Sequence, residues 1–141
     1  MLQSALMCLA MNVYYEARGE DIAGQFAVAQ VTMNRAKEQK TVCKTVLEPH
    51  QFSWTDTKLH KVYYRKGGYR HVFNRGDEPT DTKAWSQAVS VSKAILTKNN
   101  LRDITHGATF YHTKYVKPFW AKSKKYKVIA RIGNHVFYRE A

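Results

Sequence analysis

Apolar residues recur at helical spacing in the first part of the chain. Steps of four, three and four residues place four side chains on one helix face: Leu2, Leu6, Leu9 and Val13. This spacing predicts a helix over residues 2–17, for which Gly19 is a typical stop signal. A further step of three reaches Glu16, so this carboxylate continues the apolar face near the end of the predicted helix.

A second helix is predicted from about Ile22 to Arg35. Residues 26–31 are apolar almost all round, which indicates a helix that its neighbours cover. Asn34 and Arg35 fall in its last turn, where a cation complements the helix dipole.

The middle of the chain is basic and aromatic. Residues 41–56 predict a short helix or turn and then a loop, Gln51-Phe52-Ser53-Trp54. Residues 58–76 contain no acidic residue and interleave Lys and Arg with Tyr and Phe around Gly67-Gly68. Two aromatic strands around this turn and an irregular basic lobe both fit the pattern.

The last part of the chain predicts a helix and a hairpin. Asp81 or Thr82 is suited to cap a helix that ends near Asn99-Asn100. The inner face of this helix carries Ala84, Ala88, Val89, Ser92, Ile95 and Leu96. Over residues 128–132 the apolar period changes to two, and Gly133-Asn134 is a two-residue hairpin signal.

These elements predict a mostly α (α+β) fold with a small C-terminal β-hairpin. A length of 141 residues fits a single domain over 1–141, and we expect a monomer. The hydrophobic content of 44% is typical of a folded globule and argues against disorder. No apolar run approaches membrane-spanning length, and no secretion signal is recognised, so we expect synthesis in the cytoplasm.

The net charge of +12 indicates a polyanionic partner. Nucleic acid, anionic lipid and the bacterial cell wall all qualify, and charge alone does not choose among them. Residues 114–139 hold eight Lys or Arg residues and no acid, which would suit phosphate contacts. A nucleic-acid-binding module is therefore an alternative function, although no specific nucleic-acid motif is present.

Cysteine and histidine give no metal or cofactor signal. Cys8 lies in an apolar helical run, so we expect a buried free thiol rather than a disulfide with Cys43. His106 and His112 match no established ligand spacing, and the sequence has no HExxH motif. We expect no cofactor, and a zinc amidase remains a minor alternative.

Glu16 is the strongest candidate for chemistry. A carboxylate on an apolar helix face is partly desolvated, which disfavours its charged form and raises its pKa. A raised pKa is what a general acid needs at neutral pH. The alternative is an ordinary helix-end glutamate that forms a salt bridge with Arg18 or Arg35.

Six sequence blocks, in order along the chain, resemble the SleB-type cell-wall hydrolases, the family of spore-cortex-lytic enzymes and several phage lysis proteins. The blocks are 15–20 (YEARGE), 27–31 (AVAQV) with Asn34-Arg35, 51–54 (QFSW), 107–112 (GATFYH), 118–120 (PFW) and 132–138 (IGNHVFY). The resemblance implies a fold related to lysozymes and lytic transglycosylases, a peptidoglycan substrate, and Glu16 as the catalytic acid. The basic stretch 58–76 looks longer than a typical member's connection, and the family's secretion signal and wall-binding domain are not recognised. We therefore expect a bare catalytic module of the phage endolysin kind, bacteriolytic after release from the host cytoplasm or from a virion.

Cleaving a glycan strand needs a proton donor, and most glycosidases add a second carboxylate. The candidates here are Glu20, Asp56 and Asp103, and we favour a positioning role for Glu20. Without a second carboxylate, Glu16 would protonate the leaving oxygen and then remove a proton from the muramoyl 6-hydroxyl, which is lytic transglycosylation. Hydrolysis by water, as in a muramidase, remains the other route.

A glycan groove needs aromatic faces and amide donors. Phe52, Trp54, Tyr111 and Tyr138 are aromatic candidates, with core packing as the alternative for each, and Tyr111 and His112 are placed in a polar loop. The predicted substrate-binding set is Glu20, Asn34, Gln51, Phe52, Trp54, Tyr111, His112, His135 and Tyr138.

Overall fold

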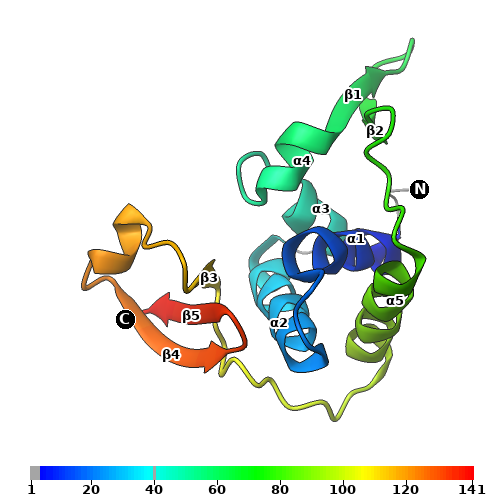
Figure 1. Ribbon diagram of the computed structural model, residues 1–141. Coiled ribbons are helices and arrows are strands. Elements are labelled where there is room, and N and C mark those ends of the chain that lie inside the picture. The colour runs from blue at the N-terminus through cyan, green and yellow to red at the C-terminus, as the bar shows by residue number, and fades with distance from the viewer. Residues whose placement is uncertain (1–3, 40) are drawn as a thin grey trace.

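Three long helices make up the helical body of the chain (Figure 1). In the computed structural model, which describes residues 4–39 and 41–141, they are α1 (Ala5–Ala17), α2 (Ile22–Gln39) and α5 (Thr82–Thr97). Each of the three contacts the other two. The predicted positions of these helices are confirmed, although Leu2 and the start of the first predicted helix lie outside the described residues. None of the helices described is long and apolar enough to cross a membrane.

Side-chain caps explain where α1 and α5 begin. Oγ of Ser4 accepts a hydrogen bond from the Met7 amide at 3.1 Å, and Oδ1 of Asp81 accepts one from the Ala84 amide at 3.0 Å. Asp81, rather than Thr82, is therefore the cap of α5. The α2 helix runs to Gln39, so the prediction that Arg35 lies in its last turn was wrong.

The connection between α2 and α5 contains two short helices and a hairpin. It comprises α3 (Val42–Leu47), α4 (Ser53–Lys58), β1 (Leu59–Tyr63) and β2 (Tyr69–Phe73). β1 and β2 pair antiparallel and project from the helical body, so the two-strand alternative for 58–76 is confirmed (Figure 1). The prediction of a loop over residues 51–54 is only partly confirmed, because α4 begins at Ser53.

A small antiparallel sheet follows α5, in the strand order β3-β5-β4. The strands are β3 (Phe110–Thr113), β4 (Tyr126–Ile132) and β5 (His135–Glu140), and the short helix η1 (Phe119–Lys122) precedes β4. The β4–β5 hairpin around residues 133–134 is confirmed. The placement of Tyr111 and His112 in a polar loop was wrong, because both lie in β3, which pairs with β5. Its partner strand begins more than twenty residues later in the chain, beyond the reach of local pattern.

The α2 helix lies between the sheet and the other long helices, and it contributes to two apolar clusters (Figure 1). Ala29 and Ala36 pack into the cluster shared with α1 and α5. Ala27 and Val31 pack against Phe137 of the sheet in the other. This double use explains why residues 26–31 are apolar almost all round.

Cys8 and Cys43 form a disulfide that joins α1 to α3, with their Cα atoms 5.2 Å apart. The expectation of a buried free thiol was therefore wrong. Cys8 is buried as predicted, but α3 packs against α1 and brings Cys43 to it. A spacing of 35 residues in the sequence gave no sign of this approach.

Candidate active site

Glu16 lies in the last turn of α1 and is partly buried. Oε1 of Glu16 accepts a hydrogen bond from the Tyr111 hydroxyl on β3. Burial raises the pKa of Glu16, and this effect outweighs the lowering by the Tyr111 hydrogen bond and the Arg35 charge. The carboxyl group is thus biased towards the protonated form that the sequence predicts.

The salt-bridge alternative for Glu16 is not what the geometry shows. Among the described residues, the ion pairs within 4.0 Å do not include Glu16. Arg18 instead donates a hydrogen bond to the Tyr14 hydroxyl. Arg35 acts on Glu16 through its charge, without a direct ion pair.

Arg35, which the sequence suggested as a helix-end cation or a salt-bridge partner of Glu16, has other contacts in this site. Its Nε donates to the Thr109 carbonyl at 2.6 Å, and its guanidinium lies over the rings of Phe52 and Phe110 at 5.0 and 5.5 Å. Its Nη1 is buried and has no hydrogen-bond partner among the residues that the structure describes. The Asn34-Arg35 pair within the second resembling block was the available signal.

His135 supports Tyr111 from the neighbouring strand. The His135 ring meets the Tyr111 ring edge-on, with centroids 5.2 Å apart, and its Nδ1 lies 3.2 Å from Oε1 of Glu20. Burial lowers the pKa of His135 more than the Glu20 charge raises it. A neutral imidazole therefore donates its Nδ1 proton to the Glu20 carboxylate, which makes this contact a hydrogen bond rather than a full ion pair.

Glu20 holds the β4–β5 turn against the start of α2. Its Oε1 accepts from the Asn134 amide at 2.9 Å, and its Oε2 accepts from the Asn134 side chain at 2.8 Å. Burial on its own would raise the pKa of Glu20, but the hydrogen bonds from Asn134 and His135 together lower it. Gly133 has φ of +56°, and a Cβ there would lie 2.9 Å from Oε1 of Glu20. These contacts engage Glu20 fully in positioning the turn.

The other two candidate second carboxylates also have partners. Asp103 accepts hydrogen bonds from the Thr105 amide and hydroxyl, the Gly107 amide and the Asn34 side chain, at 2.6–3.0 Å. These bonds lower the pKa of Asp103 against the opposing effect of burial. Asp56 is exposed, 3.4 Å from Nδ1 of His50.

Several predicted binding residues contact the protein itself. Phe52 and Trp54 are 2% and 4% exposed. Nε1 of Trp54 donates to Oδ1 of Asn12 at 2.8 Å, and Nε2 of His112 lies 2.8 Å from the buried Tyr138 hydroxyl. Asn34, besides Asp103, binds the Ala108 carbonyl at 2.9 Å.

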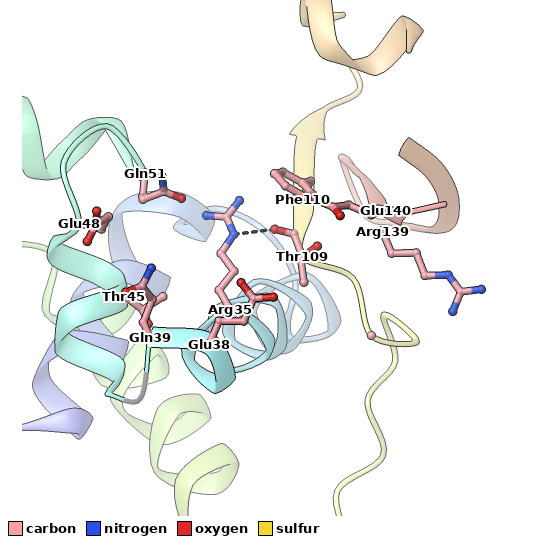
Figure 2. A pocket seen from close by; sticks show the side chains of 11 residues that line it. Arg35, Glu38, Gln39, Thr45, Glu48, Gln51, Thr109, Phe110, Arg139 and Glu140 are labelled. Atoms are coloured by element: carbon pink, nitrogen blue, oxygen red, sulfur yellow. Dashed lines mark hydrogen bonds between the residues drawn. The ribbon is translucent and has the colours of Figure 1, made fainter. Parts of the chain in front are cut away.

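A cavity of about 310 Å³ lies beside Arg35 (Figure 2). Figure 2 shows the Arg35 guanidinium between Gln51 and Thr109, so Gln51 is the predicted binding residue that faces this space. Glu16 is not among the lining residues, but Arg35 lines the cavity and its charge also reaches Glu16. The full lining is Arg35, Glu38, Gln39, Thr45, Glu48, Gln51, Gly107, Thr109, Phe110, Arg139 and Glu140.

Comparison with known protein families shows which family this chain belongs to. Residues 19–138 match the model of the Cell Wall Hydrolase family, and the chain belongs to this family. The predicted resemblance is thereby confirmed. The matched range begins after Glu16, so the match does not itself test the role of Glu16.

Proteins similar to this chain occur in the genus Bacillus. The chain is 30% identical to the spore cortex-lytic enzyme of Bacillus cereus over 96% of this chain, and it spans 44% of that enzyme's length. It is similar to the catalytic domain of SleB, a germination-specific lytic transglycosylase from Bacillus anthracis, with 25% identity and a TM-score of 0.63 over 97% of this chain and 95% of that one. The catalytic domain of the Bacillus cereus SleB protein shares the fold, with 23% identity and a TM-score of 0.61 over 96% and 89% of the two chains. The mixed α+β fold is therefore that of the SleB catalytic domain.

Proposed function

We propose that this chain degrades peptidoglycan by cleaving its glycan strand, with Glu16 as the general acid and base. Membership of the Cell Wall Hydrolase family and similarity to a lytic transglycosylase support the substrate and the reaction. The observation that carries the proposal is the environment of Glu16. Burial raises the pKa of this carboxyl, and Tyr111 binds its Oε1.

In the proposed reaction, Tyr111 orients the carboxyl group and Oε2 carries the proton. Oε2 gives this proton to the glycosidic oxygen as the bond to the muramoyl anomeric carbon breaks, which leaves an oxocarbenium-like centre. The resulting carboxylate then removes the proton of the muramoyl 6-hydroxyl. The 6-oxygen bonds to the anomeric carbon and closes an anhydro ring, and Glu16 is protonated again for the next cycle.

The state of Glu20 and Asp103, two of the three candidate second carboxylates, supports a one-acid route. Glu20 and Asp103 have lowered pKa values and are held by hydrogen bonds to the β4–β5 turn and to the 103–108 loop. Neither is free to act as nucleophile or as base for water. If water instead attacks the anomeric carbon while Glu16 removes its proton, the same site acts as a muramidase.

For substrate binding we propose a division among the predicted residues. Gln51 is exposed beside the cavity and is the best placed to donate hydrogen bonds to sugar hydroxyls. Tyr111 positions Glu16 and is itself supported by His135, while Glu20 holds the β4–β5 turn. The remaining predicted residues contact the protein itself and would act by holding the surrounding elements in place: Asn34, Phe52, Trp54, His112 and Tyr138.

Mass spectrometry of muropeptides released from purified peptidoglycan tests the function. Products that end in anhydro-muramic acid are expected. Products with reducing muramoyl ends would show that water attacks the anomeric carbon and that no anhydro ring is closed. Glycan strands left intact with free stem peptides would contradict the proposal and favour an amidase. No release, combined with tight and salt-dependent DNA binding, would favour a nucleic-acid-binding module.

A further inference from the structure

The segment that connects β3 to β4 holds apolar side chains in solvent. Phe119 is 94% exposed, Tyr115 74% and Val116 58%. Large apolar side chains that cluster on a surface mark a contact with a partner or a membrane. In Figure 1 this connection, with η1, lies on the side of the sheet away from α1 and α5, so the helical body does not cover it.

The packing of the neighbouring residue, Trp120, fixes the position of Phe119. The ring of the next residue, Trp120, packs edge-on against Tyr138 and Tyr126, with centroid distances of 5.0 and 5.3 Å, and lies 5.7 Å from the Phe110 ring. Trp120 therefore fastens η1 to the sheet. With Trp120 turned inward, Phe119 is presented outward by a fixed element.

Exposed lysines are interleaved with these apolar residues along the segment. The exposed lysines of the segment are Lys114, Lys117, Lys122, Lys124 and Lys125. No acidic residue occurs from 114 to 139, so nothing in this part of the sequence neutralises them. A segment in which exposed apolar side chains alternate with exposed lysines is typical of surfaces that lie in a membrane interface.

We propose that the segment 114–125 docks on an anionic lipid surface. Lysines attract the lipid phosphates, and Phe119 and Val116 enter the boundary between headgroups and acyl chains. A hydrated phosphate polymer of the wall would satisfy the lysines equally but would leave these two apolar side chains in water. The presence of both features therefore favours the lipid surface over the polymer.

Co-sedimentation with vesicles tests this docking, and it needs no wall substrate, so its result is independent of the proposed enzymatic function. The chain is expected to bind phosphatidylglycerol vesicles and to bind phosphatidylcholine vesicles weakly. Phe119→Ser is expected to weaken binding to phosphatidylglycerol at least about tenfold, because a large apolar side chain no longer leaves water. Phe119→Trp should retain the binding.

Leu101→Ser is the matched control, since Leu101 is 40% exposed and lies in the connection that follows α5. This variant should bind vesicles as the parent chain does. Equal vesicle binding by the parent chain and Phe119→Ser, or no vesicle binding at all, would overturn the proposal. Soluble poly(glycerol phosphate) is the second probe: a loss on Phe119→Ser as large for this polymer as for vesicles would show that the polymer is the partner.

Discussion

The hydroxyl of Tyr111 donates a hydrogen bond to Oε1 of Glu16 and joins strand β3 to the last turn of α1. The two residues are 95 positions apart in the sequence. The bond favours the charged carboxylate and so lowers the pKa of Glu16, against the larger effect of burial. It also fixes which oxygen of the carboxyl group remains available to a substrate.

Tyr111→Phe is therefore expected to raise the pKa of Glu16 further. The alkaline limb of the pH–rate profile on purified peptidoglycan should move to higher pH, because Glu16 keeps its proton longer. The rate at the optimum should fall about tenfold, since a hydrogen bond to a charged group is lost along with the orientation it gives. Tyr63→Phe, on the exposed β1–β2 hairpin, is the control. An alkaline limb that stays in place would show that Tyr111 does not act through Glu16.

The raised pKa of Glu16 also predicts a pH-dependent stability. A carboxyl group with a higher pKa in the folded state contributes stability while it is protonated, and this contribution is lost as the pH rises through the folded-state pKa. Glu16→Gln should therefore melt at a higher temperature than the parent chain at neutral pH. The difference should shrink below the pKa of an unfolded glutamate; each unit of pKa elevation corresponds to about 1.4 kcal/mol. If the difference in melting temperature is the same at all pH values, Glu16 does not have a raised pKa in the folded state.

Gly133 is expected to tolerate alanine worse than Gly67, another glycine with a positive φ. Gly133 and Gly67 both have positive φ, +56° and +99°, but only at Gly133 would a Cβ meet another residue, at 2.9 Å from Oε1 of Glu20. Gly67→Ala should cost about 1 kcal/mol of unfolding free energy from backbone strain, and Gly133→Ala about 1–2 kcal/mol more. Urea denaturation of the two variants measures this difference. Equal losses would mean that Glu20 does not hold the turn.

Reduction of the Cys8–Cys43 disulfide should destabilise the helical body. The two cysteines are 35 residues apart, and closing a loop of that length in the unfolded chain is worth about 4 kcal/mol. The melting temperature should therefore fall when reductant is added. The double variant Cys8→Ala/Cys43→Ala should melt low with or without reductant. A parent chain that melts at the same temperature in both conditions would contradict the bond.

Local signals in the sequence predicted much of the fold. The 4-3-4 spacing located α1 and put Glu16 on its apolar face, Asp81 and Thr82 together marked the start of α5, and Gly133-Asn134 marked the β4–β5 turn. Each of these depends on neighbouring residues, which is why a pattern reveals them. The prediction of an endolysin-like, phage-derived module stays a prediction.

The features that the sequence did not reveal depend on distant partners. β3 exists because β5 pairs with it, and without that pairing the segment at Tyr111 looks like a polar loop. Cys43 meets Cys8 only because α3 packs on α1. The place of Arg35 at the Glu16 site depends on the Thr109 carbonyl, which accepts its hydrogen bond from 74 residues further along the chain.

The most direct test of the account is the rate at which Glu16→Gln releases muropeptides from purified peptidoglycan. The amide is nearly isosteric but carries no acidic proton, so release should fall by a factor of about 100 or more while the protein remains folded. Glu78→Gln, which makes the same change at an exposed position, should keep the parent rate. Release by Glu16→Gln within a few-fold of the parent chain would contradict the central claim that Glu16 supplies the proton.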